Sequence, residues 1–150
     1  MPSPLLYLSA FFEATRQEYY SRLLGVSQAG AWDAWLEYFL NGVARQSEDA
    51  LSRAARINRL LTGWRRKVAG KGTKNAVLLI DAVAENPFIT VKGAAQRLEV
   101  AYTTAQRAID SLRKVKILSE RSKAKRDRVF CANEILKILE EPARLAPEQD

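Results

Sequence analysis

The longest uninterrupted pattern in this 150-residue chain covers residues 32–68, which contain no proline. Apolar or tolerated residues recur there in alternating steps of four and three, with one phase slip, as in a coiled-coil-like helix. They are Trp32, Leu36, Phe39, Val43, Gln46, Ala50, Ala54, Ile57, Leu61, Trp64 and Val68. Such a helix would span about 55 Å at 1.5 Å per residue, more than a small domain needs. Gly42 and Gly63 weaken the pattern, and a break near Gly42 is the alternative.

Two shorter helices are predicted before residue 32. Apolar residues recur at helical spacing over residues 5–12 and again from Arg16, and Gly30 is a typical C-terminal cap. Aromatic residues are frequent in this half, and at helical spacing we interpret them as core rather than as a ligand site. They are Tyr7, Tyr19, Tyr20, Trp32, Trp35, Tyr38 and Phe39.

Residues 76–140 predict helix, helix, tight turn, helix and hairpin in that order. The helices are expected over residues 77–84, 91–98, 102–114 and 134–141, with Thr90 and Asn133 as N-caps. The strands are expected over residues 115–121 and 128–132, and residues 88–89 as an extended link. This order is that of a winged helix-turn-helix. We therefore predict a mainly α fold: an N-terminal helical part with a long helix, followed by a winged helix-turn-helix with a small β-hairpin. The Gly-rich stretch near residue 70 divides the chain into predicted domains 1–70 and 71–150.

Positive charge is concentrated in two stretches of the sequence. The formal net charge is +7, and residues 53–74 hold eight basic and no acidic side chains, while residues 92–131 hold eleven basic and four acidic ones. Focused positive charge attracts polyanions, although two solvated basic faces are the alternative.

Composition excludes several kinds of chemistry. The chain has no histidine and one cysteine, which rules out imidazole-based catalysis, His-ligated metal sites and an internal disulfide framework. No apolar run reaches the ~18 residues that span a bilayer. We therefore expect a cytoplasmic, non-enzymatic protein without a metal or cofactor.

A winged helix can present its second helix to the major groove of double-stranded DNA. The expected outward residues are Tyr102, Thr103, Thr104, Gln106, Arg107 and Asp110; Thr, Gln and Arg suit base contacts, and Arg107 suits guanine. The hairpin would contact the DNA backbone or the minor groove through Lys123, Lys125, Arg126 and Arg128, and the preceding helix would clamp phosphate with Lys92 and Arg97. The alternative is a winged helix that serves as a dimerisation or protein-docking module.

Two positions depart from the ideal motif. Glu99 lies in the turn where glycine is usual for a left-handed conformation. Ala101 lies where a Ser or Thr would cap the second helix, so Thr103 or Thr104 is expected to act as the cap.

Three runs resemble the C-terminal part of Fic-family proteins: PLLYLSAFFE over residues 4–13, EYYSRLL over residues 18–24 and WDAWLEYFLNGV over residues 32–43. Members of that family transfer AMP from ATP to a protein hydroxyl, and a C-terminal winged helix is common in one branch. The family motif, His-Pro-Phe-x-Asp/Glu-Gly-Asn-Gly-Arg, is missing here. The resemblance therefore implies a fragment or truncated relative with no catalytic residue, whose helical part exposes apolar surface suited to a homodimer.

Overall fold

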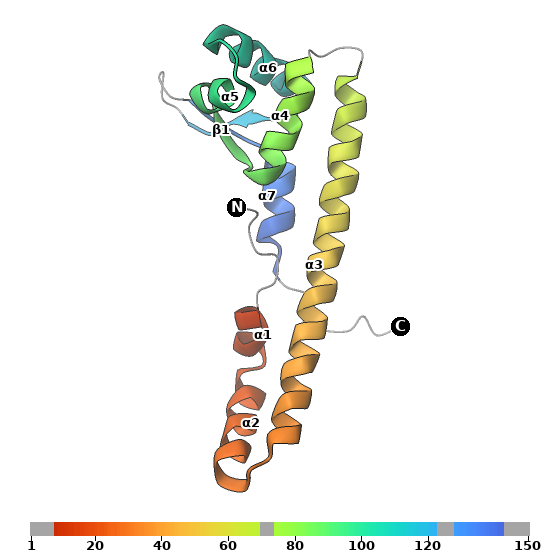
Figure 1. Ribbon diagram of the computed structural model, residues 1–150, viewed down its shortest axis with the longest axis vertical. Coiled ribbons are helices and arrows are strands. Elements are labelled where there is room, and N and C mark those ends of the chain that lie inside the picture. Colours follow the sequence, from red (N-terminus) through yellow and green to blue (C-terminus); the bar gives the residue numbers. More distant parts are fainter. Residues whose placement is uncertain (1–7, 70–73, 123–127, 143–150) are drawn as a thin grey trace. The chain divides into compact units, whose positions relative to one another are not determined.

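A computed structural model describes residues 8–69, 74–122 and 128–142 of the chain (Figure 1). This part is mainly helical, as the sequence predicts, with seven helices and one antiparallel sheet that has three strands rather than the two of the predicted hairpin. The described residues divide into two compact units. One contains residues 8–54 with Pro142, which we call the N-terminal unit, and the other contains the described residues from 55 to 141, which we call the winged unit.

The N-terminal unit is built from helices α1 (Leu8–Ala14) and α2 (Arg16–Ala29) and the first part of α3 (Trp32–Val68). Gly30 adopts a left-handed conformation with φ of 63°, and its backbone N–H donates to the carbonyl of Val26, which ends α2. Helix α3 has the predicted bounds and is continuous through Gly42, so the alternative of a break there is wrong.

Aromatic rings form most of the core in the N-terminal unit. The rings in mutual contact are those of Phe11, Phe12, Tyr19, Trp35, Tyr38 and Phe39. Gly42 adjoins this cluster, because a Cβ there would lie 2.5 Å from Cδ1 of Phe11. Tyr20 and Trp32 were predicted to be core residues, but they are 56% and 59% exposed. Tyr7 lies outside the described residues.

The buried face on the first part of α3 is partly polar, and it differs from the predicted stripe of inward residues. Gln46 is buried as predicted, but Asp49 and Arg53, which the predicted stripe omits, are also buried, and Leu36 is 49% exposed. Arg53 Nε donates to Asp49 Oδ2 at 2.7 Å, and Arg53 Nη2 donates to the carbonyl of Pro142 at 3.1 Å. The pattern omitted Asp49 and Arg53 because it did not place charged residues on the inward face, whereas pairing allows charged groups to be buried.

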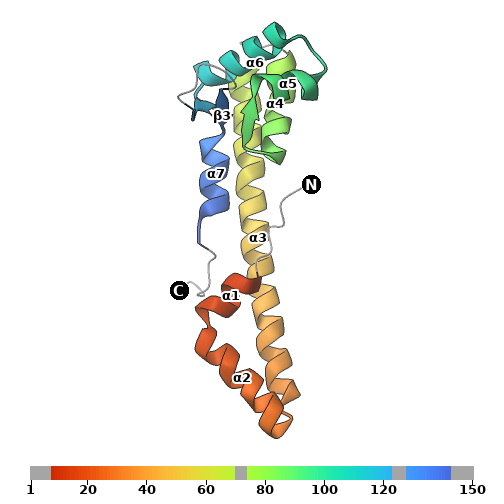
Figure 2. The same cartoon turned by 90° about the vertical axis from the view of Figure 1, so that its left-hand side faces the viewer.

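The winged unit continues with α4 (Lys74–Glu85), β1 (Phe88–Thr90), α5 (Val91–Leu98), α6 (Tyr102–Lys114), β2 (Ser119–Glu120), β3 (Val129–Cys131) and α7 (Asn133–Glu140). The last part of α3 contributes Leu61, Trp64 and Val68 to the core of this unit, where they join buried residues of α4 and α6. Helix α7 runs beside the part of α3 that follows Ala55 in both views (Figures 1 and 2), and Arg56 Nη2 donates to Glu141 Oε1 at 2.6 Å.

The sheet of the winged unit has the strand order β1-β3-β2, and both pairs are antiparallel. The extended link at residues 88–89 is therefore a third strand, with Ile89 opposite Phe130. The first predicted strand is shorter than expected, because the chain turns from Val115 to Leu118 before pairing begins, and the second is limited to Val129–Cys131. At the edge strand β1, the Phe88 N–H donates to Asn86 Oδ1 at 3.0 Å.

The start of α7 also differs from its prediction. The helix begins at Asn133, which makes Ala132 the capping position, and no side chain caps it. Asn133 Nδ2 instead donates to Ser119 Oγ at 2.6 Å, so this side chain ties α7 to strand β2.

The two compact units meet inside α3, between Ala54 and Ala55. The domain boundary predicted from the Gly-rich stretch at residues 70–73 falls outside the described residues and stays a prediction. None of the helices in the described ranges combines the length and apolarity that crossing a bilayer requires.

Candidate nucleic-acid interface

Helices α5 and α6 form the helix-turn-helix of the winged unit. Their bounds are those predicted from the sequence, and the small residues Ala94, Ala105 and Ala108 are fully buried between packed elements. Side chains of this size allow two helices joined by a short turn to cross closely. The helix pair is therefore held by its buried face, and the opposite face of α6 is left for other contacts.

The turn between these helices depends on Glu99. This residue adopts the left-handed conformation with φ of 54°, and the Val100 N–H donates to the Ala95 carbonyl at 3.0 Å. Glu99 therefore has the left-handed backbone conformation that was expected at this turn position, where glycine is usual. At the start of α5, Thr90 Oγ1 accepts from the Gly93 N–H at 3.0 Å, so the predicted cap is confirmed.

The predicted cap of α6 is wrong. Helix α6 begins at Tyr102, directly after Ala101, and no side chain caps it. The N–H groups of Thr104 and Ala105 donate to the Ala101 carbonyl instead. Thr103 lies within the first turn and its side chain is not used for capping.

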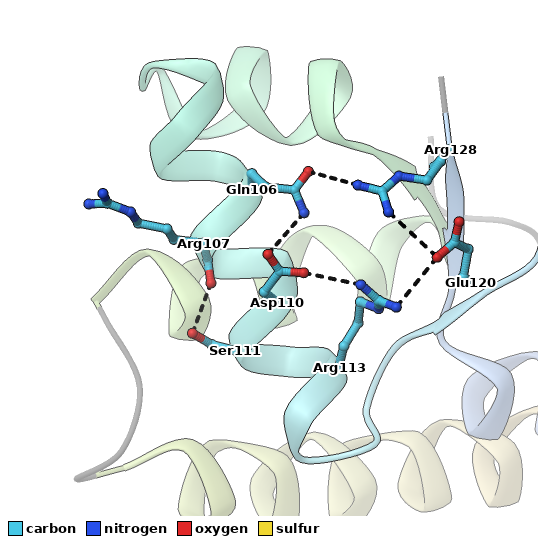
Figure 3. A network of polar contacts seen from close by, with 7 residues as sticks. All are labelled: Gln106, Arg107, Asp110, Ser111, Arg113, Glu120 and Arg128. Atoms are coloured by element: carbon cyan, nitrogen blue, oxygen red, sulfur yellow. Dashed lines mark hydrogen bonds and ion pairs between the residues drawn. The ribbon is translucent and has the colours of Figure 1, made fainter. Parts of the chain in front are cut away.

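The outer face of α6 presents polar residues that differ in exposure. Tyr102 is 59% exposed, Thr103 and Arg107 are exposed, and Thr104 and Gln106 are half-buried. Residues 103, 106, 107 and 110 follow the spacing that places side chains on one helix face. Figure 3 shows the Arg107 side chain extending away from its neighbours, while its backbone carbonyl accepts a hydrogen bond from Ser111 Oγ.

Gln106 belongs to a closed ring of five side chains that joins α6 to the hairpin (Figure 3). Gln106 Nε2 donates to Asp110 Oδ2 at 3.1 Å, and Arg113 Nη1 donates to Asp110 Oδ1 at 3.2 Å. Glu120 Oε2 accepts from Arg113 Nη2 at 3.4 Å and lies 3.8 Å from Arg128 Nη1. Arg128 Nη2 closes the ring by donating to Gln106 Oε1 at 3.5 Å. We call these five residues the interface ring.

The aromatic side chain of Phe130 packs against both arginines of the interface ring. Its side chain is fully buried, and the guanidinium carbons of Arg113 and Arg128 lie 5.4 Å and 5.7 Å from the ring centroid. Arginine over an aromatic face is attracted by the ring quadrupole. The hairpin base and the outer face of α6 are thereby held side by side, which brings Arg128 next to Gln106. Lys123, Lys125 and Arg126 lie outside the described residues.

The two predicted phosphate clamps on α5 differ from each other. Lys92 is exposed, whereas Arg97 forms an ion pair with Glu85 of α4. Arg97 and Glu85 border a shallow cavity of about 450 Å³ beside β1, which Phe88 and Ile89 also line. Arg97 is therefore already paired with a carboxylate, and Lys92 is the better candidate for a phosphate contact.

Sequence reasoning missed Arg113 and Glu120 as interface residues. Arg113 follows the outward position of Asp110 by one helical turn, and Glu120 is one of only four acidic residues within residues 92–131. An isolated carboxylate in a strongly basic stretch was the available signal, because such a residue is expected to pair with a neighbouring cation.

The element order and the strand order β1-β3-β2 define a winged helix-turn-helix fold for the winged unit. No family model matches the chain.

Proposed function

We propose that this chain is a non-catalytic, Fic-like C-terminal region that binds double-stranded DNA through its winged unit. Helix α6 would enter the major groove, with Thr103 and Arg107 as its base-reading side chains. Lys92 and the hairpin residues Lys123, Lys125 and Arg126 would contact phosphate, whereas Arg128 is paired with Glu120. Tyr102 at the exposed start of α6 and the half-buried Thr104 complete the predicted contact surface.

The observation that supports this proposal is the adjacency of the hairpin base to the outer face of α6. Arg128 bonds Gln106, which immediately precedes the exposed Arg107 on that helix. A basic hairpin beside an exposed polar helix face is the arrangement a groove-binding winged helix requires, because base contacts specify the sequence while phosphate contacts position the protein.

Fluorescence anisotropy with a labelled duplex tests the proposal. If about six phosphates are neutralised, a log-log plot of affinity against salt should have a slope of about −5. Replacing Lys123, Lys125 and Arg126 together with alanine should weaken binding to all duplexes and flatten the slope by about 2–3. Duplex binding that is absent, or that does not respond to salt at micromolar protein, contradicts the proposal.

Two single variants separate base reading from phosphate contact. Arg107→Ala should reduce discrimination between duplexes at one position by about 1–3 kcal/mol, because a bidentate contact with guanine would be lost. Lys92→Ala should weaken binding equally for all sequences and lower the salt slope by about 1. Equal effects of both variants on all sequences would exclude Arg107 as a base-reading residue.

A second candidate function is self-association through the N-terminal unit. It is supported by large exposed apolar side chains on one stripe of α3, at Trp32, Leu36 and Leu40, and by Tyr20 and Leu24 on α2. Replacing Trp32, Leu36 and Leu40 with polar residues should convert a dimer into a monomer in sedimentation or light-scattering measurements. A wild-type protein that stays monomeric at ~100 μM, a concentration well above a micromolar Kd, would contradict it.

The non-catalytic part of the proposal rests on the missing Fic motif and on the absence of histidine from the sequence. Incubation with radiolabelled ATP and candidate protein acceptors should give no transfer of label. Transfer that is lost when the purified chain is omitted would overturn this part.

A further inference from the structure

We propose that Glu120 and Asp110 restrict DNA binding to preferred sequences by holding Arg113 and Arg128 inside the electrically neutral interface ring. This inference rests on the proposed function and assigns to these two carboxylates a role in specificity. Both lie on the surface that the proposed function directs toward a polyanion, where an acidic side chain opposes binding unless it serves another purpose.

The charges of the interface ring cancel. It contains two guanidinium groups, two carboxylates and one amide, and every link between them is a direct contact of 3.8 Å or less. Glu120 contacts both arginines, through 3.4 Å to Arg113 and 3.8 Å to Arg128. Two of the positive charges at this interface are thus compensated within the protein.

The ring side chains remain accessible to an incoming phosphate. The side chains of Arg113 and Arg128 are 37% and 35% exposed, and that of Glu120 is 29% exposed. A phosphate group can therefore compete with Glu120 for either guanidinium. Non-specific affinity grows with each phosphate that a free cation neutralises, so pairing these arginines lowers affinity for every duplex, including unrelated ones.

The ring also fixes the amide of Gln106. Its Oε1 accepts from Arg128 and its Nε2 donates to Asp110, so both ends of the amide are engaged before DNA arrives. Gln106 is therefore a positioning residue that joins the recognition helix to the hairpin base. The ring keeps these two elements in one arrangement, which preferred sequences would fit and unrelated ones would not.

The variant Glu120→Gln removes one negative charge and keeps the size of the side chain. Arg128 would lose its carboxylate partner and could make one additional phosphate contact with any duplex. At 0.1 M salt, affinity for a shuffled 20-base-pair duplex should rise about 5- to 10-fold, and the salt slope should steepen by about 1. The affinity ratio between a duplex selected from a random pool by wild-type protein and the shuffled duplex should fall at least about 3-fold.

Glu140→Gln is the matched control, because this substitution makes the same change in net charge at an exposed residue at the end of α7. It should change affinity for the shuffled duplex by less than about 2-fold. Asp110→Asn is a second test within the ring and should also increase binding to the shuffled duplex. Circular dichroism and thermal unfolding establish that each variant is folded, and Asp110→Asn decides the outcome if Glu120→Gln does not fold.

The outcomes separate the two proposals. If wild-type protein binds duplexes in a salt-dependent manner but Glu120→Gln and Asp110→Asn behave like Glu140→Gln, the role of the ring is wrong and DNA binding stands. If neither the wild type nor any variant binds duplexes, the proposed function fails, and the inference fails with it. A gain confined to the two ring variants supports both.

Discussion

Position 42 requires glycine because one neighbouring side chain, that of Phe11, packs closely against it. Glycine is normally unfavourable inside a helix, and Gly42 and Gly63 both lie within α3. Only the first is required by packing, because Phe11 approaches Gly42 closely, whereas among the described residues nothing beyond the local helix backbone lies within 4 Å of a Cβ built at Gly63. The sequence marks both glycines as weak points, and only the three-dimensional contact distinguishes them.

Alanine at these two positions should therefore have opposite effects. Gly42→Ala should lower the free energy of unfolding by about 1–2 kcal/mol, because the added methyl group forces Phe11 from its position. Gly63→Ala should raise it by about 0.5–1 kcal/mol through lower backbone entropy in the unfolded chain. Urea denaturation of both variants measures these changes, and a stabilising Gly42→Ala would show that Phe11 can move freely.

The chemistry of Gln106 illustrates what sequence reasoning at the residue scale could not reach. The residue type and its helix position made it a candidate for reading bases. Its amide is instead bonded to Asp110 and Arg128. The partner at position 128 is 22 residues distant along the chain, so this contact depends on how the hairpin folds back, which no local pattern encodes.

Helices and strands differed in how well the sequence predicted them. The bounds of α3, α5 and α6 matched because caps, glycines and a prolonged apolar period define helix ends. Strand β1 was missed because three residues are too few to show an alternating pattern. Its pairing with β3 arises from long-range contacts rather than from the local sequence.

Two ion pairs with the same spacing on helices should differ strongly in their contribution to stability. Asp49 and Arg53 pair on α3 with side chains only 7% and 9% exposed, whereas Glu18 and Arg22 pair on α2 with side chains 50% and 40% exposed. Asp49→Ala should lower the free energy of unfolding by about 2–4 kcal/mol, because it leaves a buried guanidinium without this carboxylate.

Glu18→Ala is the matched control and should change stability by less than about 0.5 kcal/mol. Thermal or urea unfolding of the two variants makes the comparison. A small effect of Asp49→Ala would mean that Arg53 is stabilised sufficiently by its other contacts.

At the scale of the whole molecule, the main buried cluster of the winged unit extends from Leu61 to Ile135. The last turns of α3 belong to this core, so a fragment that starts at residue 71 would lose Leu61, Trp64 and Val68. The sequence-based division near residue 70 was drawn from glycines and charge, and it stays a prediction.

A fragment of residues 55–150 should therefore fold and, under the proposed function, retain the salt-dependent binding of the full chain. A fragment of residues 71–150 should be less stable by several kcal/mol, because three buried large side chains are lost, each contributing about 1.5–3 kcal/mol. Circular dichroism and unfolding curves compare the two. Equal stability would show that α3 is dispensable for this core.

The short edge strand β1 has a consequence for behaviour at high concentration. It is three residues long, and the Asn86 side chain already occupies the Phe88 N–H. A foreign strand that approached this border would find only three residues to pair with and the Phe88 N–H already bonded. The sheet is thus protected against the edge-to-edge stacking that seeds fibrillar aggregates, even though Phe88 itself is hydrophobic and exposed.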